Sequence, residues 1–290
     1  MELKPPTTVD EQIKLLLSRG CIIDDVEEAK SLLNSVNYYK LTAYILPFKT
    51  KDGLYTPGLT LKRIQRIYEF DKLIRNVTLL YLEEVELMLR ARISQHFACK
   101  YGALGHLDSH NFNERNKHKD FHEKFTIELD HLINKNQSLL FVQHYKEKYE
   151  NNFPLWVAIE LFTFGMLSTF YKKMKIEDQK AIARNDFSTS HTNLSNWLQC
   201  MTIMRNSCAH YSRLYFRAFP VFPATPSKMA RLNNWLFDYF LTMKFLYQDK
   251  SRWNNVFIPT ISTIITEYSD SIELKHIGFP SNWKLQLYKQ

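Results

Sequence analysis

The chain has 290 residues, a net charge of +8, and ordinary globular proportions of hydrophobic (45%) and charged (23%) residues. Its four cysteines are scattered without a CxxC pair, which excludes a disulfide scaffold and a Cys-rich zinc site and fits a reducing cytoplasm. The sequence also lacks the standard nucleotide-binding motifs, a signal peptide and an uncharged apolar run of membrane-spanning length. The basic net charge suggests a polyanionic partner.

Two short helices are expected near the N-terminus. Thr8 followed by Glu11 is a capping-box pattern that begins the first helix, and Ile13 and Leu16 give this helix an apolar face. A second helix is expected over residues 27–33. Residues 50–60 are rich in turn-forming residues and form the clearest loop of the chain.

The strongest helical periodicity lies in residues 60–101. Apolar residues recur there at three- and four-residue steps from Ile67 to Met88, and Thr60 can cap the N-terminus. No glycine or proline occurs until Gly102. The pattern therefore predicts one helix of about 40 residues, or two helices that share the segment.

The second half of the chain also reads as helical. Residues 102–120 are polar and are predicted to be a loop, and alternation typical of β-strands is nearly absent. Helices are predicted over residues 121–149, 155–175, 193–211, 228–247 and 255–267. The sequence thus predicts an all-α protein that forms one compact unit over residues 1–290, with helical extensions at 1–60 and 221–290.

The first candidate site lies near the end of the helix predicted over residues 193–211. Asn206 and His210 are four residues apart and share a polar face, with Arg205 about 100° away on an ideal helix. Metal-free RNA cleavage uses the 2′-OH as nucleophile. It needs a base, which suits histidine, and a cation for the developing phosphorane charge, which suits arginine. Asn206 could orient the phosphate or the histidine. The alternative is an incidental Arg and His on a solvated helix, because this spacing is common.

A long stretch around this motif lacks acidic residues. No Asp or Glu occurs between Asp186 and Asp238. Such depletion is what electrostatics favours around a phosphate site, and interleaved aromatic side chains can stack on bases. We therefore predict Arg213, Arg217 and Tyr211 as RNA contacts, with a local fluctuation in composition as the alternative.

A second constellation lies on the long helix. Glu83, Glu86 and Arg90 cluster opposite the apolar stripe, whereas Arg92 and His96 fall on the stripe. A buried Arg and His need partners, so this end of the helix is predicted to be a polar pocket or an interface. Arg90 and His96 also repeat the Arg–His spacing loosely. Together with Glu83 and Glu86 they are a candidate second half-site, and an ordinary salt-bridged face is the alternative.

Four histidines lie in or beside the polar segment after the long helix. Their spacing of about four residues suggests a metal site, but no carboxylate or cysteine pattern accompanies them. We therefore expect loop histidines, no metal and no cofactor. The four residues are His106, His110, His118 and His122.

Six short motifs, taken in order, resemble those of the Abi-like abortive-infection proteins, the AbiD/AbiF family. The resemblance covers about residues 5–220. The motifs are residues 37–48 (NYYKLTAYILPF), residues 67–75 (IYEFDKLIR), Glu83-x2-Glu86-x3-Arg90, His96 with Lys100-Tyr-Gly102, residues 154–171 (PLW, Glu160, FTFGMLS and Tyr171), and residues 205–214 (RNSCAHYSRL).

The resemblance implies a HEPN-like helical bundle with long amphipathic helices. The Arg–x4–6–His motif of the family falls on Arg205 and His210, with Asn206 as the adjacent polar residue. The implied function is anti-phage abortive infection by a cytoplasmic, metal-independent endoribonuclease toxin that a small non-coding RNA restrains. HEPN sites usually combine two Arg–His motifs, so a homodimer is expected unless Arg90 and His96 supply the other half. A catalytically inactive RNA-binding module is the alternative, and no membrane association is expected.

Overall fold

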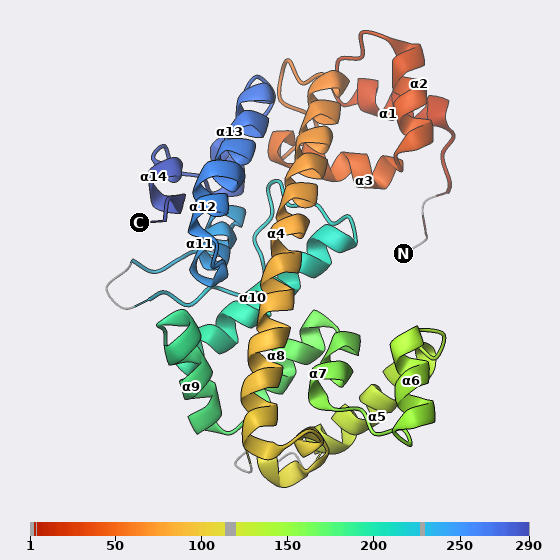
Figure 1. Cartoon of the computed structure of the whole chain (residues 1–290). Coiled ribbons are helices and arrows are strands. Elements are labelled where there is room, and N and C mark those ends of the chain that lie inside the picture. Colours follow the sequence, from red (N-terminus) through yellow and green to blue (C-terminus); the bar gives the residue numbers. More distant parts are fainter. Residues whose placement is uncertain (1–2, 4, 114–119, 227–229, 290) are drawn as a thin grey trace.

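The computed structural model describes residues 3, 5–113, 120–226 and 230–289. Within these ranges the chain folds into helices, and its only β-type pairings are isolated bridges, so the predicted all-α class is confirmed. Helix α4 (Leu61–Tyr101) runs along most of the length of the molecule, and the other helices pack around it (Figure 1).

The long helix is continuous, which confirms the single-helix form of the prediction. The Thr60 hydroxyl accepts a hydrogen bond from the N–H of Arg63 (3.0 Å) at its start. At its end, Gly102 adopts a φ of 82°, a value that glycine tolerates best. The helix has 41 residues, and at 1.5 Å per residue it is about 60 Å long.

The N-terminal helices pack beside the first half of α4 (Figure 1). The predicted capping box is present, since Glu11 accepts from the Thr8 N–H (2.7 Å) and Thr8 accepts from the Glu11 N–H (3.3 Å). The loop at 50–60 is confirmed as well. The helices of this part are α1 (Val9–Ser18), α2 (Val26–Ser35), α3 (Tyr38–Thr42) and the 3₁₀ helix η1 (Ala43–Phe48).

A second group of helices surrounds the C-terminal half of α4. These are α5 (Asp120–Lys135), α6 (Leu140–Lys148), α7 (Leu155–Ala158), α8 (Phe164–Lys173) and α9 (Ile176–Phe187). The prediction of a single helix over 121–149 is wrong, because the chain turns between α5 and α6. The Asn136 side-chain amide donates to the Leu132 carbonyl (2.8 Å) and so competes with continuation of the helix.

The helix predicted over residues 155–175 is also interrupted. The 3₁₀ helix η4 (Ile159–Leu161) follows α7, and the Thr163 hydroxyl then caps α8 by accepting from the Met166 N–H (3.1 Å). Helix α9 was not predicted at all, although acidic residues mark its first turn (Glu177 and Asp178).

Helix α10 (His191–Ala209) contacts α4, α8, α9 and α11 and therefore lies at the centre of the packing. The C-terminal elements are α11 (Leu236–Leu246), α12 (Lys250–Arg252), the π-helical turn η5 (Trp253–Phe257), α13 (Ile258–Glu267), the 3₁₀ helix η6 (Leu274–Ile277) and α14 (Trp283–Leu287). They lie beside the first half of α4 (Figure 1). The helix predicted over 255–267 is present, but it begins as the π-helical turn.

The helix predicted over 228–247 begins too early. Lys228 lies outside the described residues, and the helix starts only at Leu236. The N–H groups of Asn233 and Trp235 donate to the Asp238 carboxylate, which caps the helix at this point. None of the helices in the described part of the chain combines the length and the apolar character that a membrane span requires.

Candidate functional site

The predicted motif lies where α10 crosses α4, and the C-terminal end of α10 points toward α3 (Figure 1). Arg205 and Asn206 occupy the last turns of α10, and His210 is its C-cap residue. Asn206 and His210 are exposed, whereas Arg205 is half-buried and donates a hydrogen bond from Nη1 to Asn206 Oδ1 (3.1 Å). The structure therefore brings the three predicted catalytic residues to one helix end.

The chain turns sharply directly after His210. The Tyr211 N–H donates to Cys208 O (3.2 Å) and the Ser212 N–H donates to Ser207 O (2.8 Å), which is the bond pattern of a Schellman motif. Tyr211 takes the left-handed position of this motif with a φ of 56°. A non-glycine residue costs about 1 kcal/mol in this conformation.

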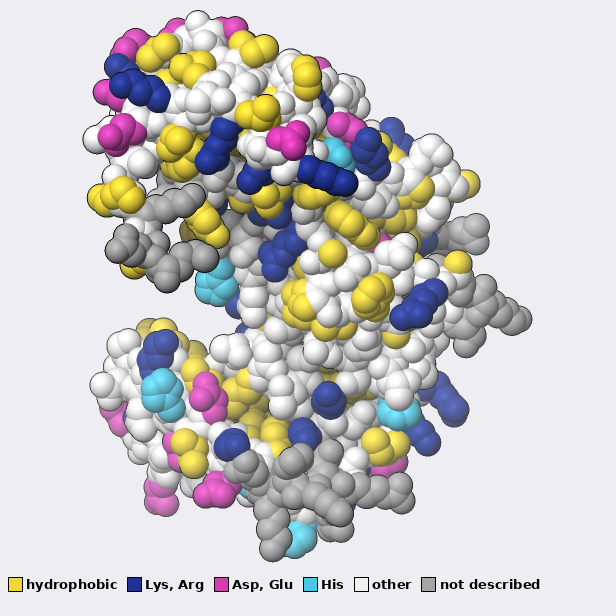
Figure 2. All heavy atoms as spheres, turned by 180° about the vertical axis from the view of Figure 1, so that it is seen from behind, with side chains coloured by type: hydrophobic (Ala, Val, Ile, Leu, Met, Phe, Trp, Pro, Cys, Tyr) yellow, Lys and Arg dark blue, Asp and Glu magenta, His cyan; other side chains and the backbone are white. Residues whose placement is uncertain are grey.

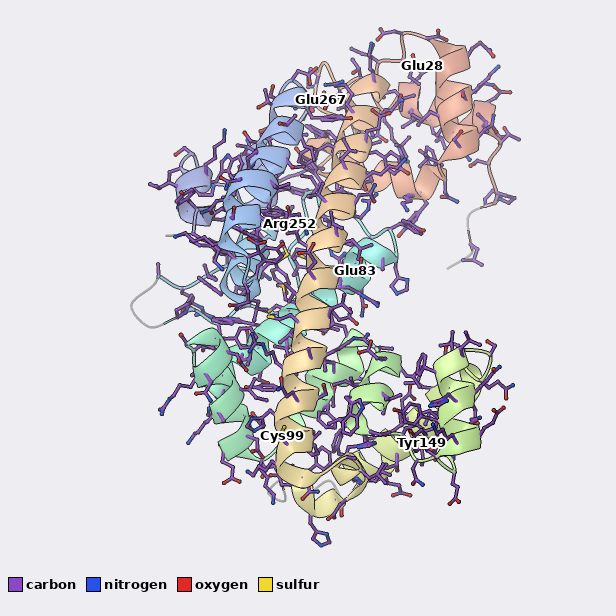
Figure 3. All side chains as sticks on the ribbon, viewed as in Figure 1. Glu28, Glu83, Cys99, Tyr149, Arg252 and Glu267 are labelled. Carbon is purple, nitrogen blue, oxygen red and sulfur yellow. The ribbon has the colours of Figure 1, made fainter. Side chains whose placement is uncertain are left out.

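A pocket of about 370 Å³ opens beside Arg205. Its walls are residues of α4 from Leu79 to Arg90, together with Arg205 and Ala209 of α10. Glu83 lies on α4 at the level where α10 crosses it (Figure 3). From behind, the molecule has a deep hollow between its upper and lower parts, with Lys, Arg and His side chains on the inner wall (Figure 2).

Two ion pairs in series, Arg90–Glu86 and Glu86–Arg205, connect α4 to α10. Glu86 Oε1 accepts a hydrogen bond from Arg90 Nη2 (2.6 Å), and Glu86 Oε2 lies 3.6 Å from Arg205 Nε. The Arg90 and Glu86 side chains are almost buried, so this pair is little screened by solvent. Arg90 therefore fixes Glu86, and Glu86 in turn orients Arg205.

Arg90 is itself held by the turn between α7 and α8. Its guanidinium donates to the carbonyls of Ile159 (2.8 Å), Glu160 (2.7 Å) and Phe162 (2.7 Å). These carbonyls lie in the interruption that separates the two helices, where intrahelical donors are missing. The arginine thus supplies the donors that this turn needs, and it is a structural anchor at the edge of the pocket.

His96 does not line this pocket. Its Nε2 lies 3.1 Å from Asp178 Oδ1 of α9, and Arg92 pairs with Asp186 of the same helix (2.9 Å). Burial alone would raise the pKa of Asp178, but hydrogen bonds from Lys100 and its neighbours lower it. The expectation of a buried arginine is wrong, because the Arg92 side chain is about half exposed. This end of α4 contacts α9 instead of lining a polar pocket. Glu83, Glu86 and Arg90 reach the pocket and His96 does not.

A buried cluster supports the segment that follows His210. Asp71 accepts hydrogen bonds from the N–H groups of Leu214 (3.1 Å) and Tyr215 (2.8 Å), from the Tyr44 hydroxyl (2.7 Å) and from Arg75. The Asp71 and Arg75 side chains are 1% and 4% exposed. Burial disfavours the charged form of Arg75, but the Asp71 carboxylate and Tyr44 together outweigh this effect and raise the pKa of Arg75.

Asp71 and Arg75 both lie in the motif of residues 67–75, but the sequence assigned them no role in the site. A signal was present, because Asp71 lies about 40° from Ile67 on an ideal helix and therefore on the buried stripe. An acid and a base four residues apart on an apolar stripe predict a buried pair. Which backbone groups the pair would hold could not be read from the sequence.

The C-terminal region supports the same segment from the other side. The Phe216 N–H donates to His276 O (2.8 Å), and the Tyr215 hydroxyl is hydrogen-bonded to His276 Nδ1 (2.8 Å) and to the Glu273 N–H (3.0 Å). Burial lowers the pKa of His276. Phe216 has a φ of 51°, so both ends of the segment 211–216 are non-glycine residues in the left-handed region.

The predicted RNA contacts differ in how accessible they are. Arg213 faces the protein, because its guanidinium donates to Ala43 O (2.8 Å). Burial of this side chain lowers its pKa. Arg217 donates to Arg213 O (3.3 Å) and lies over the Phe219 ring (5.3 Å). Tyr211 is 69% exposed and is open to a ligand.

The polar-segment histidines are dispersed. His106 is buried, His110 Nδ1 is 2.8 Å from Asp108 Oδ1, and His122 Nε2 is 3.1 Å from the His106 carbonyl. His118 lies outside the described residues. Within the described ranges, no three His, Cys, Asp or Glu side chains come together as metal ligands.

The chain was also compared with known proteins. No curated protein and no solved structure matches it. The family model described as Abi-like protein matches residues 31–216, which is more than half of the chain. The matched span contains the pocket, the buried cluster and the Arg205–His210 motif. The chain therefore belongs to the Abi-like protein family.

Proposed function

We propose that this protein is an anti-phage abortive-infection protein that acts as a metal-independent endoribonuclease toxin of the HEPN type. The observation that carries this proposal is the grouping of Arg205, Asn206 and His210 at one exposed helix end beside a pocket. Membership of the Abi-like family supports the defence role. A regulatory small non-coding RNA is part of the proposal and is expected to bind at the same exposed end of α10.

The three side chains suit metal-free cleavage of RNA. His210 is exposed and can take the proton from the 2′-OH as a general base. Arg205 offers a permanent positive charge and a planar fork for the phosphate oxygens. Asn206 Oδ1 accepts from Arg205, so the amide fixes the direction of the guanidinium.

The active site is proposed to form across a homodimer. Arg90 and His96 face different elements, which favours a second Arg205–His210 pair from another copy over a half-site within one chain. The outer face of α4 beside the pocket offers an apolar contact for that copy. Leu80 and Leu87 are seven residues apart there and are each about half exposed.

One contact favours the alternative of an inactive RNA-binding module. Glu86 lies 3.6 Å from Arg205, and a carboxylate at this distance competes with a phosphate for the guanidinium. The module would bind RNA but would leave it intact.

The test is RNA cleavage by the purified full-length protein in EDTA. His210→Ala should reduce the rate about 10²–10⁴-fold, which is the usual contribution of a general base. His191→Ala is the matched control, because His191 lies at the opposite end of the same helix. Undiminished cleavage by a folded His210→Ala protein would contradict the assignment, and binding without any cleavage by the parent would favour the inactive module.

The role of Arg205 has its own test in the same assay. Arg205→Lys should reduce cleavage nearly as much as Arg205→Ala, since lysine keeps the charge but lacks the planar pair of N–H donors that fits two phosphate oxygens. Near-normal cleavage by Arg205→Lys would show that the residue acts only as a point charge.

A further inference from the structure

A large aromatic side chain occupies a backbone position where glycine is favoured. Tyr211 stands at the left-handed position that ends α10, directly after His210. Its ring is 69% exposed, so burial of the ring does not compensate for the strained conformation. The exposed ring therefore has no structural explanation of its own.

A cation from another element lies over this ring. Lys40 of α3 places its Nζ 5.4 Å from the centroid of the Tyr211 ring, within the range of a cation–π contact. The 3₁₀ helix η1, which directly follows α3, is held in place, because Ala43 O accepts from Arg213 and the Tyr44 hydroxyl donates to Asp71. One face of the Tyr211 ring is thus covered by a positioned ammonium group.

The charges around Lys40 leave it free for an anion. Among the described residues, no carboxylate forms an ion pair with Lys40. Asp71 is the nearby acid, and it is already paired with Arg75. Burial and the charge of Arg75 both lower the pKa of Lys40, and a phosphate would relieve that repulsion.

The residue before Lys40 in α3 is also an exposed aromatic. Tyr39, next to Lys40, is 86% exposed and presents a second aromatic side chain to solvent. Arg217, whose Nη1 donates to Arg213 O, has no carboxylate partner among the described residues either. Exposed aromatic rings among unpaired cations are the combination that binds unpaired nucleotides.

We propose that Tyr211 and Lys40 form a binding subsite for one unpaired nucleotide of the RNA that is cleaved at His210. The base stacks on the open side of the Tyr211 ring, and the Lys40 ammonium contacts the phosphate of the same nucleotide. Tyr39 extends the stacking surface. The subsite rests on the proposed ribonuclease function and adds a preference for single-stranded RNA.

The experiment measures the binding of a fluorescein-labelled single-stranded RNA and of its duplex to the full-length His210→Ala protein, which should bind without cutting. Adding Tyr211→Gly should weaken single-strand binding about 10- to 100-fold, which is the usual range for one stacked base. The same change should raise the melting temperature, because glycine relieves the strained backbone. Tyr211→Phe should bind like the parent.

Lys40→Gln should weaken binding less and should reduce the slope of log affinity against log salt by about 0.7. Tyr288→Ala is the control, since Tyr288 is an exposed tyrosine of the C-terminal segment. It should leave binding unchanged.

The outcomes separate the subsite from the proposed function. If the parent cleaves RNA while Tyr211→Gly and Lys40→Gln bind single strands as the parent does, the subsite is wrong and the ribonuclease function stands. Equal losses on single-stranded and duplex RNA would also overturn the stacking subsite. A parent that neither binds nor cuts RNA would overturn both, and capture of a protein partner by Tyr211 would then replace them.

Discussion

Two acid–arginine pairs on the same helix show how equal spacing can serve different purposes. Asp71–Arg75 and Glu86–Arg90 are both four residues apart on α4, and both are buried or nearly so. In the first pair the carboxylate accepts hydrogen bonds from backbone N–H groups of the segment after His210. In the second pair the guanidinium donates hydrogen bonds to three backbone carbonyls between α7 and α8.

The difference decides which pair can take part in chemistry. Both oxygens of Asp71 accept from Leu214, and the remaining donors also lie inside the protein, so nothing is left for a ligand. Glu86 uses Oε1 for Arg90 and keeps Oε2 beside Arg205. The first pair is therefore a fixed support, whereas the second is part of the pocket.

The largest expected effect is on the fixed support. Asp71→Asn should lower the free energy of unfolding by about 3–5 kcal/mol, because it leaves the buried Arg75 charge without its partner. Urea denaturation followed by circular dichroism measures this. Arg75→Met should cost less, since Asp71 keeps its backbone and tyrosine donors. Equal losses for the two variants would show that the backbone hydrogen bonds contribute little.

The second pair should be less critical to the fold. Arg90→Lys should lower the free energy of unfolding by about 1.5–3 kcal/mol, because lysine cannot reach all three carbonyls and charge-assisted hydrogen bonds are worth about that much. Arg92→Lys is the matched control, since the Arg92 side chain is about half exposed and pairs with a single carboxylate, and it should change stability by less than about 0.5 kcal/mol. A loss for Arg90→Lys as small as that of the control would contradict the anchoring role.

Glu86→Gln should separate stability from RNA binding. We expect a smaller loss than for Asp71→Asn, about 1 kcal/mol, because Arg90 keeps its three carbonyl acceptors and glutamine can still accept from it. In a His210→Ala background, RNA should bind several-fold more tightly at low salt, since a negative charge beside Arg205 is removed. Anisotropy titrations at several salt concentrations check this. Weaker RNA binding would mean that Glu86 positions Arg205 more than it competes with phosphate.

The smallest effect on cleavage is expected at His96. Because its imidazole faces Asp178, His96→Gln should change the cleavage rate by less than about twofold while destabilising the α4–α9 contact slightly. Loss of cleavage in a folded His96→Gln protein would restore the half-site within one chain. It would also remove the argument for a site shared between two copies.

The sequence was informative where local chemistry decides the structure. The Thr8 and Thr60 caps and the unbroken stripe of α4 could be predicted, since each depends on residues that are near one another in the chain. The helix predicted over 193–211 is present as α10, but it ends at Ala209, so His210 is its C-cap residue and Tyr211 lies outside it. The break between α7 and α8 could not be predicted, because the donors that satisfy it come from Arg90, about seventy residues earlier.

The candidate site shows the same limit. The grouping of Arg205, Asn206 and His210 could be predicted from helical spacing. The composition of a segment, however, does not show in which direction its charged side chains point. Arg213 belongs to the acid-free stretch, yet its guanidinium is held by Ala43 O. Lys40 lies far outside that stretch, yet it reaches the ring beside His210. Tertiary packing thus turns Arg213 toward the protein and brings Lys40 to the Tyr211 ring, and neither position could be read from the sequence.

The contact of His276 with the segment after His210 suggests that residues 31–216, which match the family, do not form a complete folding unit without the C-terminal region. The matched span ends at residue 216, the residue whose N–H donates to His276 O. A fragment cut at this boundary would keep Asp71 beneath the segment but would lose the opposing acceptor. Chimeras between relatives should therefore exchange the motif of α10 and the region around residues 273–276 together, because the segment after the motif is hydrogen-bonded to that region.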